Sequence, residues 1–274
     1  LNKMKRSALL LADGDYAAKT GIRKKDEIGE LAGAIDVLSE KLFLAQEQSD
    51  RLDRLRADFV ANISHELKTP VTVIRGSLEA LYDQVVTDPK QVKSYHQQML
   101  RESIYLQRLV NDLLDLSKLQ NTDFVIERET LNLCDILNDA VRTAQQLAPE
   151  KELKIRRDFD TEVLTVTGDY GRLRQMFLIV LDNAVKFSPP GSEIVIALIN
   201  NCVSIRNQGP GIPREDLPHI FDRFYKTASE ENKSGSGLGL AIAKQIAVRH
   251  NINVTVESKI NGETAFCFTF PDQK

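Results

Sequence analysis

The chain has few of the features that assign a protein to a class at once. Its three cysteines stand far apart in 274 residues, so neither a disulfide framework nor a zinc site is indicated, and we expect a reducing compartment. No apolar run approaches the roughly 20 residues that span a bilayer, which predicts a soluble chain. The net charge is −3 and no basic block or arginine stripe is present, which argues against nucleic acid as a partner.

A histidine beside an acid on a long helix is the first positive feature. Apolar residues recur at spacings of three and four from Leu52 to Val85, which predicts an amphipathic helix. His65 falls nearly opposite the centre of this stripe, next to Glu66. An imidazole assisted by a carboxylate suits a nucleophile with its base, and an ordinary surface histidine is the alternative. Pro70 is expected to bend or loosen the helix there.

A second helix follows and completes a helical hairpin. Asp88 is its predicted cap and Pro89 its first residue. A broad apolar face then runs from Val92 to Leu116. One hairpin cannot bury two such faces by itself, so we expect a homodimer whose four helices share one core. His96, on this second helix, is expected at the surface or the rim.

The first forty-odd residues are not expected to form an independent globular domain. A turn at residues 13–15 precedes Asp26-Glu27-Ile28-Gly29, which opens an amphipathic helix through Leu42. This element resembles the start of the second helix of a HAMP linker. In that family the first helix follows a transmembrane segment, so the resemblance implies a piece of a membrane receptor whose membrane segment is missing. A soluble coiled-coil entry helix is the alternative.

Beyond about residue 131 the pattern changes to mixed helix and strand, which predicts an α/β layer. Residues 163–167 and 193–199 alternate or run apolar like strands, and 170–187 and 238–250 have the pattern of helices. On the first of these helices Asn183 and Lys186 lie three apart and hence on one face. There an amide oxygen can hold Mg²⁺ and an ammonium can meet a phosphate. A solvated helix face is the alternative for this pair taken alone.

Two glycine elements strengthen the case for a nucleotide. Gly209-Pro210-Gly211-Ile212 follows an expected strand at 203–206, and Gly235-Ser236-Gly237-Leu238-Gly239-Leu240 opens a helix. Small residues let the backbone approach an anion, and the first amides of a helix offer N–H donors. The second element is neither a Walker loop nor a good Rossmann fingerprint, because no Gly-Lys-Ser/Thr follows and no strand immediately precedes it. The polar stretch 226–234 between the two elements is a predicted lid, or else a mobile surface loop.

The order of these motifs resembles that of the sensor histidine kinases. His-Glu-x-x-Thr-Pro, Asp-Asn-Ala-x-Lys-Phe, Gly-Pro-Gly-Ile-Pro, Phe-Asp-Arg-Phe-Tyr-Lys, Gly-Ser-Gly-Leu-Gly-Leu and Gly-Glu-Thr-Ala-Phe stand in that family's order between Leu52 and Phe270. The resemblance implies an all-α dimeric four-helix bundle, with one helical hairpin per chain, followed by an α/β sandwich ATP-binding domain of the GHKL type. We therefore expect a partial HAMP linker and signalling helix at 1–46, a dimerisation and phosphotransfer hairpin at 47–121 and a catalytic domain at 122–274.

The resemblance also implies a role for each matching residue. His65 would accept the phosphoryl group through Nε2, Glu66 would orient and activate its ring, and Thr69 would help place the water that dephosphorylates the partner. Asn183 would hold Mg²⁺, and Lys186 a phosphate of ATP. The other residues implied to bind the nucleotide are Asn207, Gly209, Gly211, Tyr225, Lys226, Gly235, Gly237, Leu238 and Gly239.

Two residues depart from the family's pattern. The first glycine motif usually begins with an aspartate that accepts the adenine amino hydrogen, whereas Asn207 stands in this place. The loss of the charge is expected to cost roughly 1 kcal/mol of binding free energy. Ile179 stands where many members of the family have a second asparagine. That change would reduce the polar support around the metal or seal the floor of the pocket.

These features together predict an ATP-dependent protein histidine kinase that phosphorylates its own His65 and passes the group to an aspartate of a response regulator. Since no receiver domain follows in the sequence, the regulator is expected to be a separate chain. Its expected docking face comprises Thr69, Thr72, Gly76 and Ser77. We expect the cytoplasmic portion of a bacterial membrane receptor, with membrane contact only through the missing segment.

Two other functions remain as alternatives. A phosphatase-dominant enzyme would use Thr69 and tolerate the weakened adenine site. A nucleotide-sensing pseudokinase scaffold would bind ATP without forming phosphohistidine, although the intact His65-Glu66 pair argues against it. A gyrase-like or chaperone ATPase would have no need of the hairpin that carries His65.

Overall fold

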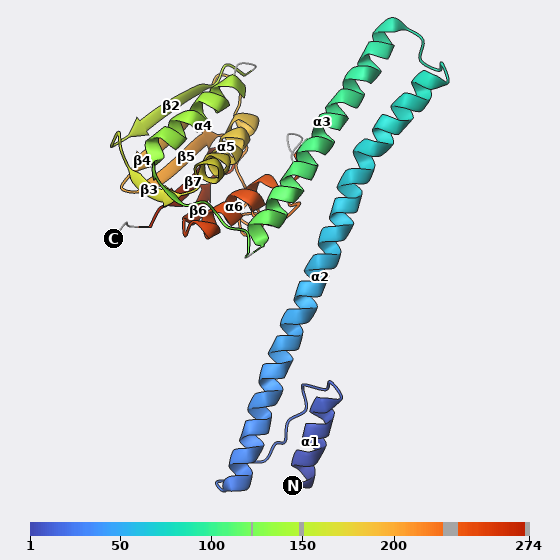
Figure 1. Cartoon of the computed structure of the whole chain (residues 1–274), viewed down its shortest axis with the longest axis vertical. Coiled ribbons are helices and arrows are strands. Elements are labelled where there is room, and N and C mark those ends of the chain that lie inside the picture. The colour runs from blue at the N-terminus through green and yellow to red at the C-terminus, as the bar shows by residue number, and fades with distance from the viewer. Residues whose placement is uncertain (122, 148–150, 227–234, 272–274) are drawn as a thin grey trace. The chain divides into compact units, whose positions relative to one another are not determined.

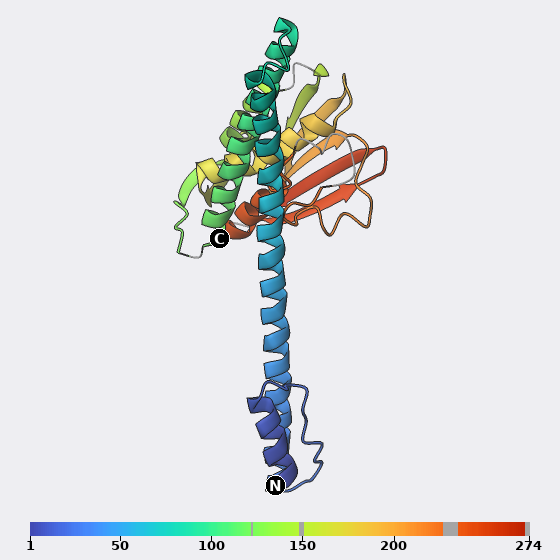
Figure 2. The same cartoon turned by 90° about the vertical axis from the view of Figure 1, so that its right-hand side faces the viewer.

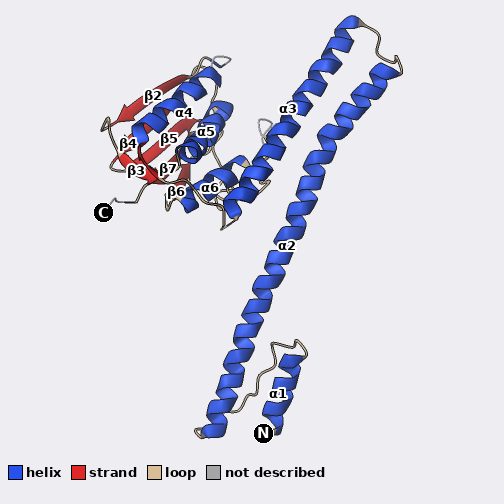
Figure 3. Cartoon of the chain, viewed as in Figure 1, coloured by secondary structure: helices blue, strands red, loops and turns tan. Residues whose placement is uncertain are grey.

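The computed structural model describes residues 1–121, 123–147, 151–226 and 235–271. It divides into two compact units, Leu1–His65 and Glu66–Lys274. The helices and strands of both are shown in Figure 1 and coloured by type in Figure 3. None of the described helices combines the length and the apolar character that crossing a bilayer requires.

The first unit is a helix, an extended connection and the beginning of a second helix. Helix α1 spans Asn2–Ala12 and α2 spans Glu27–Tyr82. The Asp26 carboxylate accepts a hydrogen bond from the Gly29 amide at 2.9 Å and so caps α2. A Cβ atom on Gly29 would lie 2.0 Å from the carbonyl oxygen of Lys24, which explains the glycine of the HAMP-like element. The assignment to a HAMP linker stays a prediction.

The second unit begins with the predicted hairpin, formed by the end of α2 and by α3. Helix α3 spans Pro89–Gln120, and the Asp88 side chain accepts a hydrogen bond from the Gln91 amide at 3.1 Å, as the predicted cap. Helix α2 runs through Pro70 without interruption, so the proline does not break the helix. It removes the amide hydrogen that residue 70 would otherwise donate to the carbonyl of Glu66.

An α/β sandwich follows the hairpin and confirms the predicted fold class. Its five-stranded sheet has the order β2-β4-β5-β7-β6, with β2 parallel to β4 and the other neighbours antiparallel. Strands β1 and β3 form a separate pair. Helices α4, α5 and α6 lie on one side of the sheet, as Figures 1 and 2 show from two directions. The elements are β1 (Glu129–Asn132), α4 (Leu133–Leu147), β2 (Lys154–Phe159), β3 (Thr165–Gly168), α5 (Tyr170–Phe187), β4 (Glu193–Ile199), β5 (Cys202–Gln208), α6 (Gly239–Arg249), β6 (Asn253–Ser258) and β7 (Glu263–Thr269).

The core of the sandwich lies between α5 and the sheet. Alternate residues of β5 and β7 are buried, which gives the sheet one covered face. Phe177 of α5 packs against Phe268 of β7, with ring centroids 5.5 Å apart. This packing fixes α5 against the sheet.

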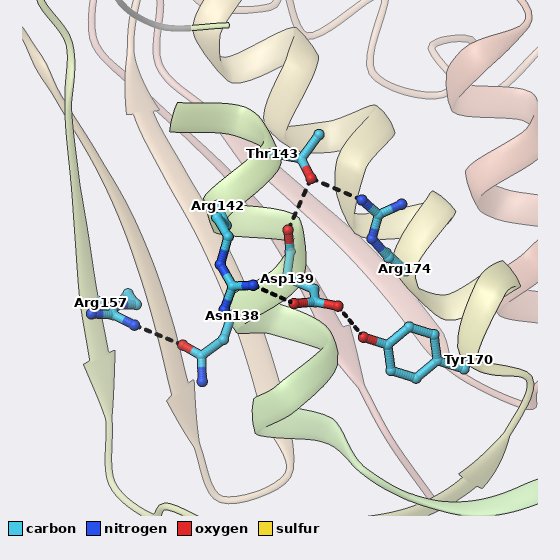
Figure 4. Close-up of polar contacts among 7 residues, drawn as sticks. All are labelled: Asn138, Asp139, Arg142, Thr143, Arg157, Tyr170 and Arg174. Atoms are coloured by element: carbon cyan, nitrogen blue, oxygen red, sulfur yellow. Dashed lines mark hydrogen bonds and ion pairs between the residues drawn. The ribbon is translucent and has the colours of Figure 1, made fainter. Parts of the chain in front are cut away.

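Polar contacts hold α4 against α5 and β2 (Figure 4). The Tyr170 hydroxyl donates a hydrogen bond to Asp139, and Arg174 donates one to the Thr143 hydroxyl at 2.8 Å. Arg157 of β2 donates to the Asn138 side chain at 2.8 Å. These contacts brace the helices that position the functional site.

Candidate functional site

One cavity of about 910 Å³ collects the residues that the sequence predicted around a nucleotide. It lies among α3, the C-terminal half of α5, the end of β5, the loops after β5 and the start of α6. Every predicted nucleotide-binding residue except Leu238 lines it: Asn183, Lys186, Asn207, Gly209, Gly211, Tyr225, Lys226, Gly235, Gly237 and Gly239. Its volume suits a ligand of nucleotide size.

Helix α5 contributes a polar edge and an apolar floor to the cavity. Asn183 and Lys186 reach it from one helical face, together with Asp182. Ile179, one turn earlier, also lines it, and its methyl group lies 3.2 Å from the position of a Cβ atom on Gly239. Ile179 therefore closes the floor of the cavity by packing against the start of α6, in a place where the family often has an amide.

Asn207 also lines the cavity, at the end of β5. The residue is 7% exposed, and its side-chain amide nitrogen donates to the Gln208 carbonyl at 3.0 Å. Among the described residues no donor reaches its amide oxygen. A buried acceptor that lines a cavity is suited to an amino group of a ligand, so the residue that departs from the family's pattern still offers an acceptor.

The glycines of the first motif are required by backbone contacts. A Cβ atom on Gly209 would lie 2.8 Å from the Phe187 carbonyl oxygen. Gly211 has a φ of +75°, and its Cβ atom would lie 2.2 Å from the carbonyl oxygen of Lys259. Larger residues would push this loop away from α5 or from the turn after β6.

The second glycine element is built around Ser236 and Gly237. Gly237 has a φ of +69°, and a Cβ atom there would lie 2.8 Å from the backbone of Phe224. The Ser236 hydroxyl accepts a hydrogen bond from the Leu238 amide at 3.2 Å and donates one to Asp112 of α3 at 2.9 Å. Leu238 is fully buried and does not line the cavity, so its contribution is to pack the start of α6 against the core.

The segment before the predicted lid is held by its aromatic residues. The Tyr225 hydroxyl donates to Asp216 at 2.6 Å, and this hydrogen bond, with burial, raises the pKa of Tyr225 to about 12. Phe221 packs edge-on against Phe266 of β7, with centroids 6.5 Å apart. His219 bonds to Asp222 at 2.9 Å on the surface. Of the predicted lid, residues 227–234 lie outside the described residues.

Helix α3 contributes side chains that the sequence did not predict. Arg108 and Asp112 line the cavity. Burial raises the pKa of Asp112, opposed by its hydrogen bond from Ser236 and by the charge of Arg108. One turn further, Asp115 pairs with Arg172 of α5 at 2.9 Å. The only sequence signal was the i, i+4 spacing of Arg108 and Asp112, which is common on solvated helix faces.

Glu66 connects the hairpin with the cavity. One carboxylate oxygen accepts a hydrogen bond from the Tyr105 hydroxyl of α3 at 2.6 Å, and the other pairs with Lys226 at 2.9 Å. The Lys226 and Glu66 side chains are only 24% and 22% exposed. The acid expected to assist His65 and the lysine expected to bind the nucleotide thus hold each other in this structure.

The phosphoacceptor candidate and most of the expected docking face are accessible on α2. His65, Thr69, Thr72 and Gly76 are exposed. Ser77 is only 5% exposed, so its assignment to the docking face is wrong. It lies three residues after Ile74, on the apolar stripe of the helix.

The residues around Asn183 suit a hard metal ion that is coordinated mainly by phosphate oxygens of a bound nucleotide and only partly by the protein. Among the described residues, no group of three or more His, Cys, Asp or Glu side chains could hold a metal. Asp182 and Asn183 nevertheless both line the cavity and carry oxygen atoms. This set fits Mg²⁺, which usually takes one or two protein oxygens together with phosphate oxygens and water.

The fold and the cavity define a class of protein: a helical hairpin with an exposed histidine, followed in the sequence by an ATPase sandwich of the GHKL type. Residues 168–274 match the Histidine kinase-, DNA gyrase B-, and HSP90-like ATPase family, and residues 55–122 match the His Kinase A (phospho-acceptor) domain. The chain belongs to the sensor histidine kinases of two-component signalling.

Named relatives agree with this family. The chain is 29% identical over 277 positions to the sensor histidine kinase YclK of Bacillus subtilis (strain 168), covering 99% of this chain and 58% of YclK. It is 33% identical over 226 positions to the sensor protein SrrB of Staphylococcus aureus (strain MRSA252), covering 80% of this chain and 39% of SrrB. The chain thus spans about half the length of these relatives.

A solved structure of a histidine kinase is similar to most of the chain. The crystal structure of the histidine kinase ThkA in complex with the response regulator protein TrrA aligns with a TM-score of 0.65 and 25% identity. The alignment covers 85% of this chain and 67% of ThkA.

Proposed function

We propose that the chain transfers the γ-phosphoryl group of Mg-ATP to His65 and passes it to an aspartate of a separate response regulator. The observation that carries the proposal is the single cavity that brings Asn183, Lys186, Asn207 and both glycine elements together. Asn207 would offer an acceptor to the adenine amino group, and Lys186, Lys226 and the start of α6 would offer positive charge and amide donors to the phosphates.

The α/β sandwich forms no covalent bond in this reaction, and its contribution is to position the ATP and to stabilise the charge of the phosphates. A bond forms between an imidazole nitrogen of His65 and the γ-phosphorus, while the bond from that phosphorus to the bridging oxygen of ADP breaks. Lys186 and Lys226 offset the phosphate charge, and the first amides of α6 add the positive end of a helix dipole. Glu66 would accept a hydrogen bond from the other ring nitrogen of His65, which holds the imidazole in the reactive tautomer.

Asn183, assisted by Asp182, would hold Mg²⁺ against the phosphates. The ion would neutralise charge on the triphosphate when bound. Both residues are on α5, which the core fixes against the sheet, so the protein would contribute oxygen ligands from a fixed helix.

Radiolabelled ATP tests the kinase assignment. Incubation with Mg²⁺ should give an acid-labile label on the chain, and His65→Ala should abolish it. His96→Ala is the matched control, since His96 is an exposed histidine on the other helix of the hairpin, and it should label normally. An acid-labile label that persists in His65→Ala would sink the assignment.

We propose that the chain acts as a homodimer and docks its regulator on α2. Apolar side chains of the hairpin remain exposed in the single chain, among them Val71, Leu78, Leu100 and Leu114, and a second hairpin would cover them. The regulator would dock at Thr69, Thr72 and Gly76, close to His65 in the sequence. The crystallised complex of ThkA with TrrA is a precedent for such docking.

A phosphatase-dominant enzyme is the second candidate. The observation in its favour is the Glu66–Lys226 pair at 2.9 Å, which occupies two residues that the kinase reaction needs while Thr69 stays exposed. An assay with a receiver domain that has been phosphorylated by acetyl phosphate distinguishes the two functions. Thr69→Ala should slow receiver dephosphorylation and keep autophosphorylation, whereas His65→Ala should do the reverse.

We also propose a cytoplasmic place for the chain in a bacterial membrane receptor, with the division 1–46, 47–121 and 122–274. The support is the HAMP-like connection with its required Gly29 and the sensor proteins among the relatives. Limited proteolysis tests the division, because cleavage should fall near 121 and 122 before it reaches the sandwich.

A further inference from the structure

We infer that Tyr105 is a positioning residue for phosphorylation of His65, acting through the carboxylate of Glu66. The inference rests on the proposed kinase function. Tyr105 lies on α3, which is antiparallel to α2 in the hairpin, and its hydroxyl donates to Glu66 Oε2 at 2.6 Å across 39 residues of sequence. A hydroxyl held this close to a carboxylate makes one of the stronger kinds of hydrogen bond in proteins.

The two oxygens of Glu66 have partners of different origin. Oε2 is bound by Tyr105 from the hairpin, and Oε1 by Lys226 from the nucleotide cavity. When Lys226 turns to a phosphate of bound ATP, its contact with Oε1 weakens and the contact with Tyr105 remains. Tyr105 then limits the rotation of the carboxylate of Glu66, the residue that directly follows His65 on α2.

The state of the tyrosine suits this role. Burial and the hydrogen bond to Glu66 raise the pKa of Tyr105, with smaller contributions from Glu102 and Asp112. The hydroxyl therefore stays protonated at neutral pH and donates to the carboxylate. A protonated hydroxyl does not act as a base toward the imidazole, and it leaves the Glu66 carboxylate negatively charged.

Tyr105→Phe tests the inference because it keeps the ring and removes the donor. We expect the initial rate of His65 labelling at saturating ATP to fall about tenfold, while the KM for ATP changes less than about twofold. Tyr95→Phe is the matched control, a half-buried tyrosine on the same helix, and should label like the wild type. A wild-type rate in Tyr105→Phe would overturn the inference.

A double-mutant cycle separates positioning from a loss of structure. If Tyr105 acts through the carboxylate, Tyr105→Phe should have almost no further effect in a Glu66→Gln background. Equal losses in both backgrounds would assign Tyr105 a merely structural role and overturn the inference.

Phosphoramidate, a small phosphoryl donor that needs no nucleotide site, makes the two possible failures distinguishable. Wild type that reacts with phosphoramidate but not with ATP would contradict the proposed function. The inference would then stand if Tyr105→Phe reacts about tenfold more slowly than wild type and fall if the two react alike. A wild-type His65 that reacts with neither donor would overturn both.

Discussion

The protonation state of His250 is fixed by its neighbours. The residue is 6% exposed and lies at the C-terminal end of α6. The Asp169 amide donates to Nε2 at 3.1 Å, so Nε2 is an acceptor and Nδ1 carries the proton that contacts the Ile246 carbonyl at 2.8 Å. A second proton on Nε2 would face the amide hydrogen of Asp169, and the histidine is built into the fold in its neutral form.

We expect His250 to make folding sensitive to acid. Burial lowers its pKa below the ordinary value of 6.5. Below about pH 6.5 the unfolded chain binds a proton that the folded chain does not, so stability is complete above this pH and is lost as the pH falls, by at most about 1.4 kcal/mol per pH unit. Urea unfolding between pH 7.5 and 5.5 measures the loss.

Two variants identify the residue responsible. His250→Gln should have a lower free energy of unfolding than the wild type at pH 7.5. Between pH 7 and 5.5, however, its free energy of unfolding should fall by less than that of the wild type. His96→Gln, which changes an exposed histidine, should keep the wild-type dependence. An unchanged dependence in His250→Gln would show that other groups cause it.

Asn207 is expected to relax the choice of base. An amide can turn to present either an acceptor or a donor, whereas a carboxylate can only accept. The wild type should therefore tolerate the carbonyl that replaces the amino group in inosine nucleotides. Asn207→Asp should raise the preference for ADP over IDP about tenfold, as measured by calorimetric titration with Mg²⁺. An unchanged ratio would mean that this side chain does not contact the base.

At the scale of whole elements, helices and strands with a clear apolar period were predictable. The expected helix 170–187 and strand 193–199 agree with α5 and β4, whose bounds are Tyr170–Phe187 and Glu193–Ile199. Helix α4 was missed although its buried residues recur at helical spacing. Strand β2 was missed for a physical reason: it is an edge strand with exposed charged residues and little apolar alternation.

The contact of α3 with the segment before α6 brings an acid into the cavity beside the second glycine element. Asp112 is half-buried, lines the cavity and is bound to Ser236. Asp112→Asn keeps the hydrogen bond and removes the charge, so it should bind Mg-ADP several-fold more tightly at low salt, with a smaller gain at high salt. Asp115→Asn, which alters the acid paired with Arg172, is the control. Unchanged or weaker binding in Asp112→Asn would exclude competition with the phosphates.

At the scale of the whole molecule, the site depends on residues that no local pattern connects. Each glycine motif could be found from its own sequence, because a positive φ or a close backbone contact requires glycine there. The Glu66–Lys226 pair joins positions 160 residues apart, and Arg108 and Asp112 enter the cavity only because α3 packs against α6. These contacts follow from tertiary packing, so neighbouring residues in the sequence carry no sign of them.

The exposed apolar face of the hairpin predicts how two chains assemble. Leu78 lies on the apolar stripe of α2 and is 53% exposed in the single chain. In a four-helix dimer it would be covered, and a glutamate there would bury a charge without a partner. Leu78→Glu should therefore weaken the dimer at least about a hundredfold, as measured by sedimentation over a range of concentrations. Val248→Glu is the matched control, since Val248 is also 53% exposed but lies on α6, and it should sediment like the wild type. Equal dimerisation of both variants would place the interface elsewhere, and the apolar stripe would then need another partner.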